Sequence, residues 1–515
     1  MKLSKIIFTI LIFIFSSLLM LFAIKGRVDK LDNFYYQQQK DTSVGSPFES
    51  SNSNARYALT EAIVKDKSFL LSPDLAKFAS PDVVQYKGKF ISIFTPGISL
   101  IGVPFYLLGE KIGIPQITTY LSVTIFGILN IFLVAHLARK LGAGFYESLI
   151  GGLLFLFASN SLSYSLSFTQ HELSSTVLLL ALTNAIGERN LVKNIIFGVL
   201  VGIGILADIP NVILMAPIGI YIFFKHLRLK KTQTKVKKTL TILSLLGIVL
   251  GLIPFAGIFA YYNFKTTGSY AKIAQNIGRS NAFSVDSIQN SDDYLKKAED
   301  VGGKSSSSLP FNSRKELSGF YTLLISDERS WLYYSPIILV GILGIWIGFK
   351  SKKVKDILVI AVAIIGTNIL LYSMFGDPWG GWAFGPRYLI PAAAILSAMI
   401  PIAITKYKKK IIFIIPMTLL VGYSVYINSL GAITTNAIPP KVEAQSLSTG
   451  IPYTYKYNEN LASQNQSSSL VYNAFITNNL SLDIYIKEFS LFSFALIAFS
   501  FIFAFFDKER KNKNV

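Results

Sequence analysis

Cysteine is absent from this chain, and charged side chains are scarce. None of the 515 residues is cysteine, which excludes disulfide bonds, a thiolate nucleophile and a cysteine-ligated metal. Charged residues make up only 15% of the sequence and apolar residues 51%, a balance too hydrophobic for a soluble protein of this length. The segments between the hydrophobic parts of the chain must therefore be held together by packing alone.

The apolar residues are grouped in long uncharged runs. A run of about 18–22 residues crosses a hydrocarbon core of about 30 Å, so each run reads as one membrane span. The pattern predicts an all-α polytopic membrane protein with about twelve transmembrane helices and long external loops. The first run is followed by AIKGRVDK rather than by a small-residue cleavage site, so we expect a retained signal-anchor. The predicted spans are 6–24, 114–137, 146–163, 172–187, 193–207, 209–224, 240–262, 333–349, 356–374, 387–405, 411–430 and 488–506.

Acidic residues are outnumbered, because 49 Lys and Arg residues face 29 Asp and Glu residues, for a formal charge of +20. The basic residues cluster in short segments between spans, which favours membrane topology and argues against a nucleic-acid partner. If both termini are cytoplasmic, all of these basic segments fall on the cytoplasmic side. The sequence therefore predicts a multi-pass protein of the cytoplasmic membrane.

Three long segments then lie outside, and such loops usually carry function. They are 25–113, 263–332 and 431–487. Segment 95–109 must be an interfacial helix on the external side, because counting it as a span would invert every later loop. We divide the chain into a transmembrane region, 1–430, and a C-terminal region, 431–515. The C-terminal region holds an external loop, the last span and a basic cytoplasmic tail.

The first external loop holds the densest set of ionisable side chains. A carboxylate there can accept a proton from an attacking hydroxyl, and nearby cations can stabilise a phosphate. Asp82 is the first candidate for the catalytic acid, followed by Asp74 and Glu61, and Lys87 and Lys89 are candidate phosphate ligands. The alternative interpretation is that these acids are solvated loop charges.

Arg387 begins a span on the outer face, within DPWGGWAFGPRYLIP (377–391). A guanidinium at this level can bind a phosphate through two parallel hydrogen bonds. The alternative is an interfacial aromatic belt with a snorkelling arginine.

His171, in SYSLSFTQHELSS (163–175), is one of three histidines and lies at the outer start of a span. It has neither an HExxH motif nor a second histidine nearby, so the sequence implies no metal or other cofactor and leaves a divalent cation open. A hydrogen-bonded structural histidine is the alternative. Asp208, in ADIPN, reads first as a turn residue, and the charges at 327–329 read as a local ion pair.

These motifs, taken in order, resemble a known family. Together with a retained first span and an acidic external loop, they are YKGKFISIFTPGISLIGVPFYLLG (86–109), SFTQHELSS (167–175), ISDERSWLYYSP (325–336) and WGGWAFGPRYLIP (379–391). From residue 1 to about residue 405 the chain resembles the C-type (GT-C) membrane glycosyltransferases of bacterial and archaeal envelopes. The branch that it looks most like is related to dolichyl-phosphate-mannose protein mannosyltransferases.

The resemblance implies an enzyme that moves a hexosyl or pentosyl group from a polyprenyl-phosphate donor to a glycan, lipid or protein acceptor on the external side. Members of the family often carry an acid just before the position that matches Arg56-Tyr57, where this chain has Asn54. This departure shifts the expected catalytic role to Asp82. The residues expected at the substrate are Arg56, Tyr57, Lys87, Lys89, His171 and Arg387.

Two alternatives from other classes stay open. A transporter or flippase of a lipid-linked sugar would need ionisable groups inside the spans, of which the sequence offers almost none. A non-catalytic envelope scaffold is the other, because an acid is missing at Asn54.

Overall fold

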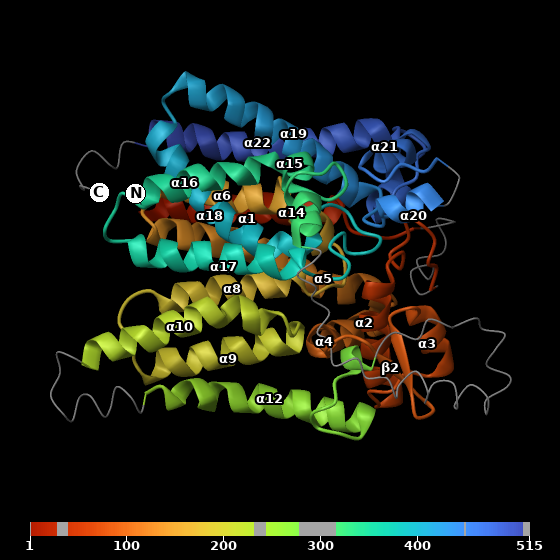
Figure 1. Ribbon diagram of the computed structural model, residues 1–515. Helices are drawn as coiled ribbons and strands as arrows, with labels where there is room; N and C mark the ends of the chain where they lie inside the picture. Colours follow the sequence, from red (N-terminus) through yellow and green to blue (C-terminus); the bar gives the residue numbers. More distant parts are fainter. Residues whose placement is uncertain (1, 28–39, 231–243, 278–315, 447–449, 508–515) are drawn as a thin grey trace.

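Long helices run side by side in a bundle, with both chain ends at one end of it and the longer loops at the other (Figure 1). This computed structural model describes residues 2–27, 40–230, 244–277, 316–446 and 450–507. The basic segments 138–140, 350–355 and 406–410 lie at the end that holds the termini, which we call the basic end; the opposite end is the loop end. Much of the predicted second external loop, the basic segment 231–238 and the basic tail after residue 507 lie outside the described residues.

Each predicted span falls on a helix of this bundle, so the chain is an all-α polytopic membrane protein, as the sequence predicts. Among the described residues, seven helices are long and apolar enough to cross a membrane by length and composition, and four shorter helices are apolar. A further helix, α8, lies inside the bundle and is buried along most of its length. The bundle helices are α1 (Lys2–Phe22), α5 (Pro115–Lys140), α6 (Phe145–Phe157), α8 (His171–Ala185), α9 (Leu191–Ala207), α10 (Asn211–Lys230), α12 (Leu246–Thr267), α16 (Val340–Gly348), α17 (Lys355–Ser373), α18 (Ile390–Tyr407), α19 (Ile411–Ile433) and α22 (Leu482–Phe506).

The centre of the bundle is α18, which neighbouring helices approach closely. On α16, a Cβ atom added at Gly341 would lie 2.4 Å from the carbonyl oxygen of Leu396, and one at Gly344 would lie 2.0 Å from that of Met399. Only glycine permits such an approach of two helix backbones. The small residues therefore determine how α16 packs on α18.

Residues 51–112 form a small cap at the loop end, which we call the loop-end cap. Its hairpin has a two-residue turn, Lys87-Gly88, with φ angles of 49° and 70°, the positive values that a type I′ turn requires. Ser72 caps α3 by accepting a hydrogen bond from the backbone N–H of Leu75 at 3.3 Å. The cap consists of α2 (Ser51–Glu61), η2 (Ala62–Asp66), α3 (Pro73–Ala79), β1 (Val83–Tyr86), β2 (Lys89–Ser92) and α4 (Gly97–Ile112).

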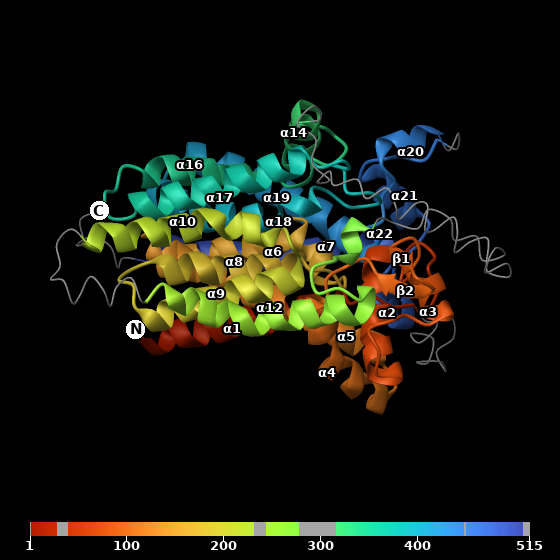
Figure 2. The same ribbon diagram turned by 60° about the horizontal axis from the view of Figure 1, so that its bottom comes forward.

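Helix α4 covers the segment that the sequence predicts to be interfacial. It lies near the loop end of α5, outside the bundle (Figure 2). One of its faces packs on the rest of the loop-end cap and on α5, whereas Leu107, Leu108 and Ile112 remain exposed. An apolar exposed face beside a membrane bundle suits a helix that lies at the interface. The side of the membrane on which α4 lies stays a prediction.

A buried ion pair lies at the start of the first loop, and its acid is hydrogen-bonded to the region after α19. Lys25 and Glu49 are 2.7 Å apart, with side-chain exposures of 2% and 1%. The second Glu49 oxygen accepts hydrogen bonds from the hydroxyl of Thr435 at 2.6 Å and from the backbone N–H of Gly45 at 2.8 Å. These contacts hold two segments at the loop end together without a disulfide.

Arg329 does not form the local ion pair that the sequence suggests. Its guanidinium is fully buried and donates hydrogen bonds to backbone carbonyls of Glu328, Trp379, Ile438, Pro439 and Tyr453. It therefore connects loops that are far apart in the sequence. The remaining short elements are α7 (Ser161–Ser165), η3 (Ala274–Asn276), α14 (Glu316–Leu324), α15 (Trp331–Tyr334), η6 (Pro336–Leu339), η7 (Arg387–Leu389), α20 (Lys441–Ser446), α21 (Lys456–Ser463) and η8 (Tyr472–Ile476).

Candidate active site

Arg56 lies at the centre of a polar cluster where the loop-end cap meets the bundle. Its guanidinium donates to the backbone carbonyl of Asn52 at 3.0 Å and to the Asn52 side-chain oxygen, both one turn earlier on α2. It also donates to Oε1 of Gln170 at 2.7 Å, and its guanidinium carbon lies 3.7 Å from the ring centroid of Phe94. These contacts fix both the position and the plane of a buried cation.

Gln170 connects Arg56 to a carboxylate, that of Asp208. The Gln170 amide nitrogen donates to Oδ2 of Asp208 at 3.0 Å. Asp208 follows the last residue of α9 and is partly exposed. Burial raises the pKa of its carboxyl, while the charge of Arg56 acts against that rise. A carboxylate in this state is a better proton acceptor than one that is freely solvated.

Asp82 is a further carboxylate whose charge acts on Arg56. It is 3% exposed, precedes β1, and accepts a hydrogen bond from the hydroxyl of Ser51 at 2.7 Å. Burial lowers the pKa of Arg56 to about 10, and the charges of Asp208 and Asp82 raise it. Arg56 is therefore protonated at neutral pH, and the charges of two carboxylates stabilise its protonated form. Asp82 is a buried side chain rather than a solvated loop charge.

Arg387 brings a second guanidinium to the cluster. Its charge acts on Arg56, Asp208 and His171, which places it in the same electrostatic neighbourhood. The guanidinium carbon lies 5.3 Å from the ring centroid of Tyr388, and Nε has no hydrogen-bond partner among the described residues. Gly380, at a φ of 75°, approaches so closely that an added Cβ atom would lie 2.9 Å from that Nε.

His171 closes the cluster from the first turn of α8. Its ring meets that of Tyr164 edge-on at 5.2 Å, and it is 4% exposed. Burial lowers its pKa well below 6.5, and the charges of Arg387 and Arg56 lower it further. The imidazole is therefore neutral at physiological pH. Its Nε2 has no hydrogen-bond partner among the described residues, so a bound ligand can use it.

The arrangement is suited to an anionic substrate that has an electrophilic centre, which a hydroxyl group can attack. The charge of Arg387 lowers the affinity of Arg56 for its proton, and an anion bound near both guanidinium groups would offset that repulsion. The charges of two carboxylates, Asp82 and Asp208, also act on Arg56, and a carboxylate can accept a proton. Among the described residues, no group of three His, Asp or Glu side chains is close enough to hold a metal ion.

Comparison with known proteins gives structural neighbours only. No protein-family model matches the chain, and no curated protein matches it either. The chain is similar to ArnT from Cupriavidus metallidurans in the apo state, at 12% identity and a TM-score of 0.46, over 96% of this chain and 77% of that one. For ArnT bound to undecaprenyl phosphate the values are 11%, 0.43, 97% and 77%. It is also similar to an Archaeoglobus fulgidus oligosaccharyltransferase in complex with Zn and sulfate, at 14% identity and a TM-score of 0.46, over 85% of this chain and 55% of that one.

The other residues predicted from the sequence lie outside the cluster. Glu61 is 3.3 Å from Lys40 and 3.4 Å from Lys65, and Asp74 is exposed in the first turn of α3. Both acids fit the alternative of solvated or surface-paired charges. The residues Lys87 and Lys89 lie exposed at the hairpin turn, Tyr57 packs among Phe48, Phe78, Tyr106 and Tyr120, and Asn54 donates to the carbonyl of Phe48.

Sequence reasoning missed Asp208 and Gln170 as members of the site. ADIPN has the composition of a turn, and that local reading hides a carboxylate which only tertiary packing brings to Arg56. A usable signal was present, because both residues are polar and lie at the outer ends of predicted spans. Arg387 likewise lies at the outer end of a predicted span.

Proposed function

We propose that the chain is an integral membrane glycosyltransferase that uses a polyprenyl-phosphate sugar at the loop end of its bundle. The observation that carries the proposal is the meeting of two guanidinium groups, Arg56 and Arg387, with two carboxylates, Asp82 and Asp208. The negative charge of a lipid-linked phosphate at the membrane surface complements the two guanidinium groups. An acceptor hydroxyl needs a carboxylate to take its proton. The family resemblance of the sequence agrees with this chemistry.

In the proposed reaction, a carboxylate takes the proton of the acceptor hydroxyl as its oxygen attacks the anomeric carbon. The bond between that carbon and the phosphate oxygen breaks, the electron pair stays on the phosphate, and the configuration at carbon inverts. Arg387 and Arg56 stabilise the charge that develops on the leaving phosphate. Neutral His171 can donate or accept one hydrogen bond through Nε2 without adding charge.

Asp208 is the carboxylate better placed to accept the proton. It is partly exposed, so an acceptor can reach it, and its raised pKa favours proton uptake. Asp82, the candidate from the sequence, is almost wholly buried and is held by Ser51. We therefore assign to Asp82 the balancing of the Arg56 charge, and we keep it as the second candidate for the base.

The test is an assay of the purified full-length chain in lipid with a panel of radiolabelled polyprenyl-phosphate sugars. We expect one donor to lose its sugar, with release of free polyprenyl phosphate, and Asp74→Asn to leave the rate close to wild type. A chain that turns over no donor on the panel, with any envelope acceptor extract, would contradict the proposal.

The flippase alternative gains one observation from the structure. Glu172 is an ionisable group that is fully buried within the bundle, which the sequence reading missed. It accepts hydrogen bonds from Asn130 at 2.9 Å and Ser161 at 2.8 Å. A flippase would move intact donor across vesicle membranes without releasing free polyprenyl phosphate. The same labelled donors therefore separate the two functions.

A further inference from the structure

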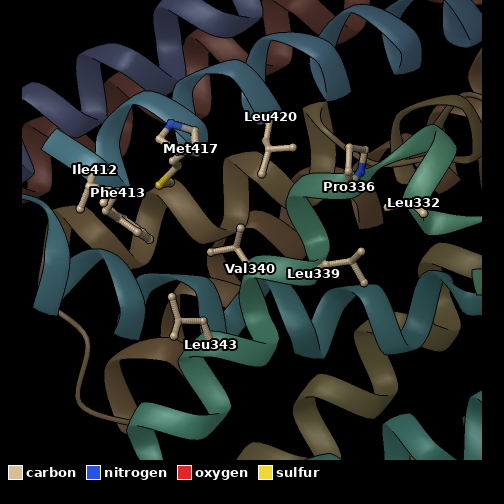
Figure 3. A pocket seen from close by; sticks show the side chains of 10 residues that line it. Leu332, Pro336, Leu339, Val340, Leu343, Ile412, Phe413, Met417 and Leu420 are labelled. Atoms are coloured by element: carbon tan, nitrogen blue, oxygen red, sulfur yellow. The ribbon is translucent and has the colours of Figure 1, made fainter. Parts of the chain in front are cut away.

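A groove on the side of the bundle lies between α16 with its leading turn η6 and the first half of α19 (Figure 3). Its volume is about 380 Å³, and its walls are apolar. Leu339, Val340 and Leu343 form one wall, and Phe413, Met417 and Leu420 form the other. Pro416, which also lines the groove, lies inside α19 and has no backbone N–H to donate within the helix.

The surface around the groove faces lipid. Ile412 is 81% exposed on α19, and Trp346 is 56% exposed on α16. In water such side chains would be costly, whereas in a bilayer they contact acyl chains. The groove spans Ile412 to Leu420 along α19, about 12 Å at 1.5 Å per residue. It is long enough for part of one lipid chain.

The two ends of the groove differ. Toward the loop end, the hydroxyl of Tyr423 donates to the carbonyl of Tyr333 at 2.9 Å, and the ring of Tyr333 stacks on that of Tyr455 at 4.9 Å. These aromatic side chains close that end. At the basic end, no comparable hydrogen bond or ring contact joins the two walls within the described part of the chain, so a lipid chain can enter there.

Lysines surround the open end. The amine of Lys410 lies 5.3 Å from the ring centroid of Tyr407, which packs against the groove residue Phe413 at 5.7 Å. On the other wall, the amine of Lys350 lies 4.0 Å from the ring of Trp346. The segments 350–355 and 406–410 contain eight lysines in all and no acid. The groove thus joins an apolar slot to a positively charged mouth.

We propose that this groove binds an anionic phospholipid, with one acyl chain between α16 and α19 and the headgroup phosphate at Lys350 and Lys410. Charge complementarity selects this occupant, because a zwitterionic lipid would bring its own cation to the lysines. The lipid-linked donor of the proposed function is a poor fit, since its phosphate belongs at the opposite end of the bundle. The proposal does not depend on the proposed function.

Trp346 provides a local probe. It is the one tryptophan near this mouth, and the other three, Trp331, Trp379 and Trp382, precede the loop-end starts of α16 and α18. The full-length chain is placed in bilayers that contain phosphatidylglycerol or phosphatidylcholine with brominated acyl chains, which quench nearby tryptophan. Subtraction of the signal of Trp346→Phe isolates the groove.

We expect Trp346 to be quenched at a lower mole fraction of the anionic lipid than of the zwitterionic lipid. Lys350→Gln and Lys410→Gln should each reduce this preference about fivefold, whereas Lys140→Gln, exposed at the same end of α5, should not change it. Val340→Phe fills the groove and should weaken quenching by both lipids; Leu420→Phe repeats this test from the other wall.

Equal quenching by the two lipids would overturn the proposal. So would a loss of preference in Lys140→Gln as large as in Lys410→Gln, because the effect would then come from general surface charge. A preference that survives both groove-filling substitutions in protein of unchanged thermal stability would place the lipid outside the groove and contradict the assignment.

Discussion

Arg56 and Asp208 are joined through one side chain, Gln170, which accepts a hydrogen bond from the arginine at 2.7 Å and donates one to the aspartate at 3.0 Å. The arginine belongs to the loop-end cap, and the aspartate follows the helix α9. The bridge keeps cation and carboxylate apart while fixing their orientation. A direct ion pair would neutralise both groups, whereas the bridged arrangement leaves each able to meet substrate.

Replacing each carboxylate of the site separates their roles. Asp208→Asn keeps the shape but removes the proton acceptor, so we expect turnover to fall about 10²–10⁴-fold with little change in donor affinity. Asp82→Asn removes charge beside Arg56 and should act mainly on donor affinity. Rate and donor binding are measured for both variants, with Glu61→Gln as the control. If only Asp82→Asn loses turnover, Asp82 is the base.

The pH dependence of turnover should reflect the environment of Asp208. A base must be ionised, and burial raises the pKa of this carboxyl above its usual 3.8. Activity should therefore fall as pH decreases through a midpoint above that value. The measurement is kcat/KM against pH for the wild type and for Gln170→Leu, which deletes a hydrogen bond that favours the ionised form and should move the midpoint upward. A midpoint that does not move would remove Asp208 from the proton-accepting role.

The spans could be predicted from the sequence because apolar length alone determines what crosses a bilayer. Arg387 and Asp82 could be named because each is a charge next to apolar or aromatic sequence. The sequence alone could not exclude Tyr57 from the site, because it is next to Arg56. Successive helix positions point about 100° apart, so Arg56 contacts the cluster whereas Tyr57 packs against Phe48. Asp208 depends on a contact between α2, α8 and the end of α9, which no local pattern encodes.

The side of the membrane on which the loop end lies can be tested with single cysteines, because the chain has none of its own. Glu110 is exposed on α4, whereas Gly109 is packed so that an added Cβ would lie 1.9 Å from the hydroxyl of Thr118. We therefore choose Glu110→Cys. An impermeant maleimide should label it from outside intact cells, and Lys140→Cys only after the cells are opened. The reverse pattern would invert the proposed topology.

The Lys25–Glu49 pair makes a stability prediction. Glu49→Gln leaves a buried ammonium without its counterion and weakens the link to Thr435, so we expect a loss of about 3–5 kcal/mol. The double variant Lys25→Met/Glu49→Leu buries no unpaired charge and should be less destabilised than the single one. Thermal unfolding of both in the same detergent gives the comparison. Equal losses would show that the charges contribute little beyond packing.

A substitution of Arg387 that keeps the charge but removes the planar guanidinium distinguishes a phosphate ligand from an aromatic-belt residue. If its guanidinium binds the donor phosphate through two parallel hydrogen bonds, Arg387→Lys should lower donor affinity by about ten- to a hundredfold, the loss of one charge-assisted hydrogen bond. Arg329→Lys is the matched control, since that arginine holds backbone carbonyls and its replacement should lower the melting temperature first. Donor binding and melting temperature are measured on the same preparations. Unchanged binding in Arg387→Lys would return the residue to the belt, because a snorkelling cation needs only its charge; weaker binding in a protein of unchanged melting temperature identifies the phosphate ligand.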